Sequence, residues 1–437
     1  MKRLLSLFLA LLVCFLPLSV LAEAAGTVSE DYDPMWQLAE PYGFKFGGAF
    51  SFDDMTNKTF MNFLARHFNS LTCCNETKAY SLLDQRKSQK SEDGMPRMSY
   101  AQADAMVGWA RRQGIQIRGH VLVWDAYMTK WFFHEDYDTT KPLADQETMK
   151  ARLASYIDQV MTHFEERYPG VIYCWDVVNE AIGDNGGEYS ASDPRHLRTK
   201  RNGESNCFLD AIGEDYVEYA FLCARNTQEK LGADIKLFYN DYNLFYSDKR
   251  QAACALAKSI QSYATDEEGN PRSLIDGIGM QGYMGGYGTQ SGCLDPGIIF
   301  NVKKSIETYS SLGLEVQLTE MAVRNFDKTK AAEHAAFYSR LFSTVFMKAN
   351  TEEKHPLTAV CIWGLVDAYE GRKDYVYNLN SPYGCLLTRD YKIKTCFDAI
   401  YHTLKGTSPA THTDLKQNSN PCRYRQGFLT LFIIFQF

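Results

Sequence analysis

The sequence has no long basic run, and its 53 acidic residues exceed its 46 basic ones, which gives a formal net charge of −7. Proteins that bind nucleic acid or an anionic membrane surface usually present a concentrated basic patch. We therefore expect neither partner. The sequence also lacks a C-x-x-C pair and any group of His and Cys residues at the spacing of a zinc site. A metal site is accordingly not predicted.

The chain also has no Pro/Ser-rich linker and no self-similar repeat that would require a second domain or a solenoid. Its 437 residues, 45% of them apolar, can bury one large core. We expect a single catalytic domain over residues 41–405, preceded by a short polar lead (25–40), in a monomeric protein. A polar tail (406–437) ends in ten apolar residues, too few to span a bilayer. A cleaved lipid-anchor signal, a docking tail and an unstructured end remain open for it.

The first 24 residues have the parts of a secretory signal peptide: a basic start, an apolar run over 4–22 and small residues near its end. We predict cleavage and a secreted protein; a retained membrane anchor is the alternative, because the run approaches spanning length. Of the 12 cysteines, Cys14 lies in this segment, which leaves eleven, an odd number for a compartment that permits disulfides. Their pairing cannot be read from the sequence.

Apolar runs with strand character alternate with longer segments of helical periodicity from residue 43 onward. This alternation is typical of an α/β protein, and eight evenly spaced units favour a (β/α)8 TIM barrel over an open sheet. The predicted strands are 44–50, 68–74, 115–124, 171–178, 235–240, 275–281, 314–319 and 359–365. The predicted helices are 101–112, 147–167, 216–231, 249–263, 298–312, 331–347 and 396–404.

Two of the predicted strands end in a glutamate. The segment YCWDVVNEA at 173–181 presents Asn179 and Glu180 to a glycine-rich loop, and the segment LEVQLT at 314–319 is followed by Glu320. Because barrels of this kind keep their chemistry at the carboxyl ends of the strands, both glutamates should face one site. Two such carboxyl groups suggest the cleavage of a glycosidic bond.

With these residues the chain resembles glycoside hydrolase family 10, whose best-known members are endo-β-1,4-xylanases. The resemblance covers roughly residues 41–405 and includes further blocks in the family's order: GHVLVW at 119–124, NDYN at 240–243, DGIGMQ at 276–281 and WGLVD at 363–367. It implies that Glu180 is the acid/base and Glu320 the nucleophile of a retaining hydrolase, whose carboxyl groups stand about 5 to 5.5 Å apart. This mechanism needs no cofactor.

The resemblance also implies which residues bind the sugar. Asn179 would hydrogen-bond the 2-hydroxyl of the sugar next to the cut, and Trp363 would lie beneath that sugar. A buried structural role remains open for His120, and core packing for Trp363. The full set of implied substrate-binding residues is Asn75, Lys78, His120, Trp124, Asn179, Gln281, Tyr283 and Trp363.

Several glycone-side positions depart from the family pattern. Cys74 stands where the family usually has Glu, and Ala79 where it has Trp; Asp125 and Tyr127 replace a His and a Gln, and Gly371 replaces a Trp. We interpret these changes as a loss of aromatic cover and of charged hydrogen-bonding partners on this side. The identity of the bound glycan is therefore the least constrained part of the prediction.

Two further departures concern the nucleophile. Tyr283 replaces a His, and Ala322 replaces an Asp, both of which are linked to the nucleophile in the family. We hypothesise one coordinated change, in which the Tyr283 hydroxyl donates directly to ionised Glu320 and needs no orienting Asp.

The sequence thus predicts a secreted, retaining endo-β-1,4-glycanase, with xylan as the expected polymer. A β-glycosidase of the same fold that acts on another β-1,4 glycan or a glycoside is the first alternative. A noncatalytic carbohydrate-binding relative is the alternative from another class, although such a protein has no need for two opposed carboxyl groups.

Overall fold

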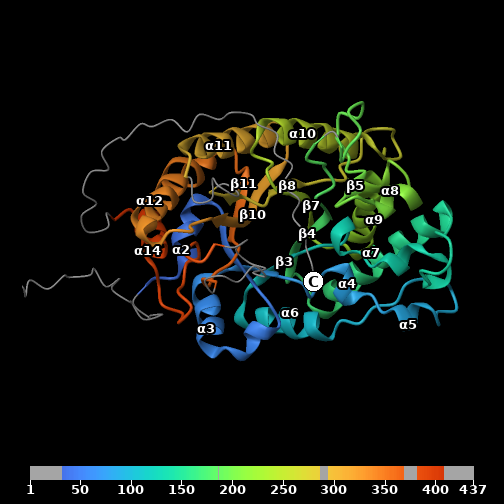
Figure 1. Ribbon diagram of the computed structural model, residues 1–437, viewed down its shortest axis with the longest axis horizontal. Helices are drawn as coiled ribbons and strands as arrows, with labels where there is room; N and C mark the ends of the chain where they lie inside the picture. Colours follow the sequence, from blue (N-terminus) through green and yellow to red (C-terminus); the bar gives the residue numbers. More distant parts are fainter. Residues whose placement is uncertain (1–31, 186, 286–293, 369–380, 408–437) are drawn as a thin grey trace, which may run out of the picture.

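The computed structural model describes residues 32–185, 187–285, 294–368 and 381–407. The predicted signal peptide and the apolar C-terminus lie outside these residues. Within them, eight parallel strands form a barrel in the order β11-β1-β2-β3-β4-β7-β8-β10, and pairing of β10 with β11 closes it (Figure 1). They are β1 (Lys45–Phe50), β2 (Ser70–Cys73), β3 (Gln116–Gly119), β4 (Ile172–Asn179), β7 (Lys236–Asp241), β8 (Gly277–Met280), β10 (Glu315–Val323) and β11 (Leu357–Ile362). The predicted barrel is confirmed.

Helices surround the barrel on its outer side (Figure 1). The longer ones are α3 (Lys58–His67), α6 (Ala101–Gln113), α7 (Gln146–Arg167), α9 (Tyr216–Leu231), α10 (Ser247–Ser262), α11 (Pro296–Ser310), α12 (Ala331–Leu341) and α14 (Thr395–Lys405). The sequence did not predict α3, which starts where the Asn57 side chain accepts a hydrogen bond from the Phe60 N–H. The predicted helix 331–347 changes after α12 into a π-helical turn, Phe342–Phe346.

Two strands differ from their predicted bounds in ways that shape the site. Strand β3 ends at Gly119 rather than at residue 124, so His120 and Trp124 lie in the loop that follows it. Strand β10 continues past Glu320 to Val323, because its last residues pair with the short strand β9 (Tyr283–Met284). In this register Ala322 lies opposite Tyr283.

The barrel interior holds a buried charged cluster. Arg118 donates both Nη groups to the carboxylate of Asp176, and its Nε lies 2.8 Å from Gln317 Oε1. Burial opposes ionisation of Asp176, but the Arg118 charge and the hydrogen bonds outweigh it and hold the Asp176 pKa below its usual value. Gly279 leaves space for Arg118 and for the nearby side chain of Asn240. A Cβ atom at residue 279 would stand 2.4 Å from Asn240 Oδ1 and 3.1 Å from Arg118 Nη2.

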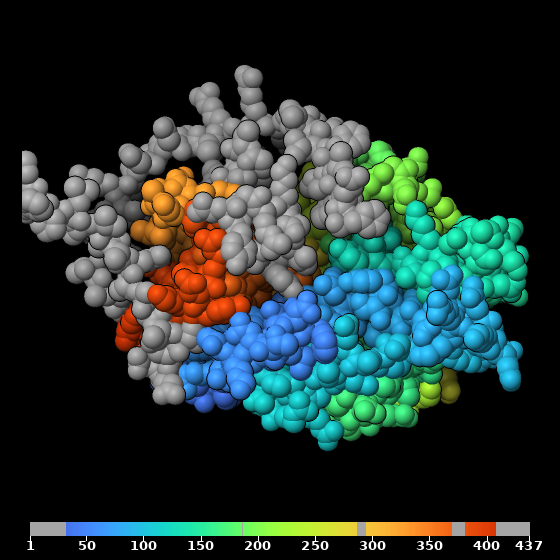
Figure 2. All heavy atoms as spheres, turned by 60° about the horizontal axis from the view of Figure 1, so that its bottom comes forward, coloured from blue at the N-terminus to red at the C-terminus, as the bar shows by residue number. Residues whose placement is uncertain are grey.

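The start and end of the described chain pack together at one side of the barrel (Figure 2). The ring of Tyr32 meets Phe397 and Tyr401 of α14 edge-on, at centroid distances of 5.3 and 4.9 Å, and its hydroxyl donates to Asp398. Next to it, the short helix α2 (Met35–Ala39) buries Met35 and Ala39. Part of the predicted lead (25–40) is thus packed onto the barrel.

Two further findings concern the described residues as a whole. No helix among them has the length and apolarity needed to cross a membrane. Seven of their cysteines carry free thiols: Cys73, Cys174, Cys207, Cys223, Cys254, Cys361 and Cys396.

Candidate active site

The two predicted catalytic glutamates lie at the carboxyl ends of β4 and β10. Glu180 follows β4 in a left-handed backbone conformation, with φ of 56°, and its N–H lies 2.9 Å from the carbonyl of Asn240. The Glu320 N–H lies 3.0 Å from the carbonyl of Gln281. Both side chains are buried, at 7% and 5% exposure. The ends of β7 and β8, which lie between β4 and β10 in the barrel, thus hold the backbone of both glutamates, and both carboxyl groups are shielded from bulk water.

A bridge of side-chain amides connects the two carboxyl groups. Gln281 Nε2 donates to Glu180 Oε1 at 2.9 Å and to Asn179 Oδ1 at 3.2 Å. Asn240 Nδ2 donates to the same Asn179 oxygen at 2.9 Å and to Glu320 Oε1 at 3.0 Å. Asn240 is not among the site residues predicted from the sequence, although it opens the NDYN block at the end of a predicted strand.

Asn179 keeps one unused donor in the middle of this bridge. Its Oδ1 accepts the two hydrogen bonds above, whereas its Nδ2 is buried and has no hydrogen-bond partner among the described residues. An unpaired buried N–H costs free energy, so such groups usually have a partner in the functional state. A hydroxyl group of a bound sugar is a partner of the right kind, which fits the predicted role of Asn179.

Tyr283 lies beside the second carboxyl group. Its hydroxyl donates to Glu320 Oε2, and its ring packs against Ala49, Cys74 and Trp363. Burial raises the pKa of Glu320 above its usual value, and neighbouring Glu180 adds to this effect, while His120, the Tyr283 hydroxyl and Lys78 act in the opposite direction. Burial and nearby Glu320 raise the pKa of Tyr283 well above its usual value, so the phenol stays protonated and can donate.

The departures at 283 and 322 lie next to each other in the structure. Ala322 stands opposite Tyr283 across the β9–β10 pair, and Ala322 is buried. The geometry that the sequence hypothesis requires, a phenol on Glu320 without an intervening Asp, is present.

His120 is oriented from below by the charged cluster of the barrel. Its Nδ1 lies 2.8 Å from Asp176 Oδ2, and the same carboxylate binds Arg118. The His120 ring meets Trp124 and Trp363 at centroid distances of 5.9 and 6.1 Å. With Nδ1 held by a carboxylate, Nε2 is the nitrogen left to face a ligand. His120 and Trp363 thus lie together at the site.

The remaining predicted residues form one wall of the site. Lys78 Nζ lies 3.2 Å from Asn75 Oδ1 and 5.0 Å from the centre of the Trp124 ring. Burial lowers the pKa of Lys78, an effect that the carboxylates of Glu320 and Glu180 and the thiol of Cys74 counteract. The buried ammonium therefore lies close enough to both glutamates for their charges to act on it.

Aromatic side chains extend this wall outward. Tyr127 packs against Trp124 at a centroid distance of 4.4 Å and against Tyr80 at 5.4 Å. We call these three residues, Trp124, Tyr127 and Tyr80, the aromatic strip. Tyr127 and Tyr80 are 37% and 41% exposed. The interpretation that this side has lost its aromatic cover is therefore incomplete, because two tyrosines supply aromatic surface next to Lys78.

Cys74 and Gly371, two other departures, have different outcomes. Cys74 is fully buried in a small apolar cluster with Ala49 and Trp363, so an apolar contact stands where the family usually has a carboxylate. Gly371 lies outside the described residues.

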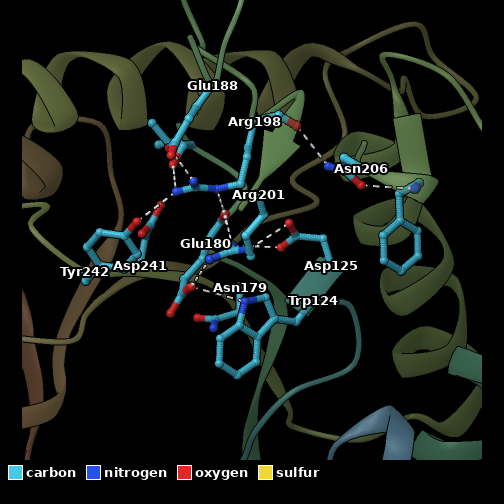
Figure 3. Close-up of polar contacts among 12 residues, drawn as sticks. Trp124, Asp125, Asn179, Glu180, Glu188, Arg198, Arg201, Asn206, Asp241 and Tyr242 are labelled. Carbon is cyan, nitrogen blue, oxygen red and sulfur yellow. Dashed lines mark hydrogen bonds and ion pairs between the residues drawn. The ribbon is translucent and has the colours of Figure 1, made fainter. Parts of the chain in front are cut away.

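Arg201, which was not predicted from the sequence, contacts Glu180, the candidate acid/base. Arg201 Nη1 lies 3.0 Å from Glu180 Oε2, the oxygen that also accepts from Trp124 Nε1 at 3.2 Å (Figure 3). The other side of the guanidinium pairs with both oxygens of Asp125, at 2.8 Å each. No sequence signal pointed to Arg201, because it lies in a polar segment with neither strand periodicity nor a family block.

Comparison with known proteins places this site in a family. The model of glycosyl hydrolase family 10 matches residues 35–403. A putative endo-1,4-beta-xylanase of Caldicellulosiruptor saccharolyticus is 35% identical over 306 residues, which are 68% of this chain and 89% of that protein. Endo-1,4-beta-xylanase B of Butyrivibrio fibrisolvens is 32% identical over 333 residues, but the match spans 75% of this chain and only 47% of that protein.

A solved structure agrees with the fold. The N-terminal endo-1,4-beta-D-xylanase 10B of Clostridium thermocellum, whose CBM22-1 and GH10 modules were crystallised with xylohexaose, superposes with a TM-score of 0.70 at 27% identity. The match covers 86% of this chain and 68% of that one.

A closed α/β barrel with two buried glutamates at the ends of its strands is the architecture of a barrel glycoside hydrolase. The family match makes the assignment specific. This chain belongs to glycosyl hydrolase family 10.

Proposed function

We propose that this protein is a secreted, retaining endo-1,4-β-xylanase with Glu320 as nucleophile and Glu180 as acid/base. One observation carries the proposal: the two buried carboxyl groups are bridged by Gln281, Asn179 and Asn240, next to the unpaired Asn179 Nδ2. A simple binding site has no use for two opposed carboxyl groups held in this way, and a double displacement requires both.

In the first step, Glu320 attacks the anomeric carbon while Glu180 gives its proton to the leaving glycosidic oxygen. The bond from carbon to that oxygen breaks, a glycosyl ester forms on Glu320, and the shortened chain leaves with a new hydroxyl group. The Tyr283 hydroxyl and the Asn240 amide, one on each oxygen of Glu320, hold the attacking carboxylate in its orientation. Asn179 Nδ2 donates to the 2-hydroxyl, a contact that strengthens in the transition state.

In the second step, ionised Glu180 takes a proton from water, and the resulting hydroxide attacks the same carbon. The ester bond to Glu320 breaks, and the sugar leaves with the configuration it started with. Gln281 Nε2 on Oε1 and Trp124 Nε1 on Oε2 are donors that favour the ionised carboxylate needed at this stage.

Xylan is the proposed polymer because the relatives reported above are named endo-1,4-beta-xylanases and because one related structure contains xylohexaose. A second candidate for the polymer is another β-1,4 glycan, because the residues on the glycone side differ from those usual in the family. Cys74 makes an apolar contact with Ala49 and Trp363 there, and the aromatic strip provides a surface on which sugars can stack. Secretion rests on the signal-like sequence of residues 1–24.

A substrate panel tests the proposal. The purified protein is incubated with xylan, β-1,4-glucan and β-1,4-mannan, the products are sized, and their anomeric protons are followed by NMR from the first minutes. Release of short xylo-oligosaccharides that first appear as the β-anomer is the expected result. Release of glucan or mannan fragments alone would favour the second candidate, and an initial α-anomer would refute the retaining mechanism. N-terminal sequencing of protein from the culture medium tests secretion.

A further inference from the structure

The acid/base candidate carries a contact that the proposed mechanism does not require. Arg201 belongs to a small hairpin formed by β5 (Lys200–Arg201) and β6 (Glu204–Ser205), which lies between β4 and α9 in the chain. From there its guanidinium reaches Glu180 in two ways, with Nη1 on Oε2 at 3.0 Å and Nη2 on the backbone carbonyl at 3.3 Å (Figure 3).

The same guanidinium is paired with a second carboxylate. Asp125, from the loop after β3, receives Arg201 Nε and Nη2 at 2.8 Å each, the planar two-bond geometry that arginine forms with carboxylates. Asp125 is one of the positions at which the sequence departs from its family. The structure gives a reason for that departure: Asp125 is the partner of a charged residue contributed by the hairpin.

We propose that Arg201, held by Asp125, is a positioning residue that favours the ionised form of Glu180. Three donors already converge on the Glu180 carboxylate, and the one from Arg201 carries a full positive charge. Protonating Glu180 would weaken this charged hydrogen bond. The inference rests on the proposed function, because it assumes that Glu180 has to cycle between its two protonation states.

Direct recognition of an anionic sugar by Arg201 is less compatible with the contacts. Nε, Nη1 and Nη2 together make four hydrogen bonds to Asp125 and Glu180, and an arginine has five N–H groups to offer. The side chain is only 21% exposed. Most of its hydrogen-bonding capacity is thus used inside the protein.

Other ionisable groups also act on Glu180, so the effect of Arg201 has to be separated from theirs. A like carboxylate stands at Glu320, and a cation at Lys78. The remaining groups whose charge interacts with Glu180 are Tyr127, Asp241, Tyr242 and Tyr283. Arg201 differs from these groups because it donates a charged hydrogen bond to the Glu180 carboxylate itself.

The consequence is a shift of the alkaline limb of the pH profile. In the free enzyme the first step needs protonated Glu180, so activity falls once Glu180 loses its proton. Stabilising the ionised form moves that fall to lower pH. Replacing Arg201 by a neutral residue should therefore move the alkaline limb of kcat/KM to higher pH, by about one pH unit for the loss of one adjacent opposite charge.

The test compares Arg201→Met with Lys200→Met, using an aryl β-xylobioside between pH 4 and 10. Lys200 is the exposed neighbour on the same strand, so its replacement removes the same net charge without touching Glu180. The expected result is an upward shift of the alkaline limb in Arg201→Met only. An unshifted limb in Arg201→Met, or equal shifts in both variants, would overturn the proposal. Arg201→Gln replaces Arg201→Met if the latter does not fold, as judged by circular dichroism.

Two more variants complete the test. Asp125→Asn leaves the Arg201 charge without its counter-charge, so the alkaline limb should move to lower pH; a shift to higher pH would refute the pairing. Glu180→Ala should lose most of its activity and regain turnover with azide, an anion that needs no general base: it attacks the anomeric carbon of the glycosyl ester, the bond to Glu320 breaks, and a β-glycosyl azide leaves. If Glu180→Ala keeps full activity, the proposed function fails, whereas an unshifted Arg201→Met with a normal Glu180→Ala response refutes only the role of Arg201.

Discussion

Removing the hydroxyl of Tyr283 should change how Glu320, the proposed nucleophile, ionises. In the wild-type protein this hydroxyl donates to Glu320 Oε2, while burial pushes the Glu320 pKa upward. Tyr283→Phe keeps the ring that packs against Trp363 and Cys74 but removes the donor. The Glu320 pKa should then rise further, because nothing in the new side chain stabilises the ionised carboxylate.

The size of the effect follows from the type of hydrogen bond. A hydrogen bond to a charged group contributes about 1.5–3 kcal/mol, and one pKa unit corresponds to about 1.4 kcal/mol. The shift should therefore be about one to two units. Because Glu320 attacks only when it is ionised, the acid limb of kcat/KM should move to higher pH by that amount, and activity on the acid side of the optimum should fall tenfold or more.

The assay measures kcat/KM for an aryl glycoside with a good leaving group from pH 3 to pH 9. Tyr309→Phe is the matched control, since Tyr309 is also buried but its hydroxyl donates to the Leu244 backbone carbonyl, at 2.8 Å, instead of to a glutamate. An acid limb that stays in place in Tyr283→Phe would refute the assigned role. Equal shifts in both variants would show that the effect is a general response to a lost buried hydroxyl.

Two further predictions concern the barrel interior and the aromatic strip. Asp176→Asn leaves buried Arg118 without its counter-charge, so the free energy of unfolding measured by urea titration should fall by about 3–5 kcal/mol. The control, Asp158→Asn, breaks an exposed ion pair with Lys230 and should lower that free energy by only about 0–1 kcal/mol. Tyr80→Ala should lower the ratio of kcat/KM for long xylo-oligosaccharides to kcat/KM for xylobiose about two- to tenfold, because a stacking surface is lost. Leu143→Ala, which changes another exposed apolar residue, should leave this ratio unchanged. Equal ratios in the two variants would rule out sugar stacking on the strip.

The sequence predicted the features that depend on periodicity and on local blocks. The eight barrel strands follow from the alternation of apolar runs and helical segments, and Glu180 and Glu320 could be located because each follows such a run. Strand ends were less predictable. The tail of β10 is a strand because β9 pairs with it, and β9 has only two residues, too few to give a sequence pattern.

The contacts that adjust the two carboxyl groups could be predicted only in part. A phenol on Glu320 was foreseeable, because Tyr283 lies two residues after the DGIGMQ block. Arg201 was not, because its position depends on how a polar hairpin folds back over β4 and meets Asp125. A pairing between residues 76 positions apart in the chain leaves no local signature.

The most direct test of the central claim is to trap the covalent intermediate. The protein is incubated with a 2-deoxy-2-fluoro-β-xylobioside that carries an activated leaving group, digested with a protease and analysed by mass spectrometry. The fluorine slows both formation and breakdown of the glycosyl ester, and the activated leaving group speeds only its formation. A fluoroxylobiosyl group should therefore accumulate on the peptide that contains Glu320, and Glu320→Ala should give no adduct. Full activity without any adduct, or an adduct on a different residue, would contradict the assignment of Glu320 as the nucleophile.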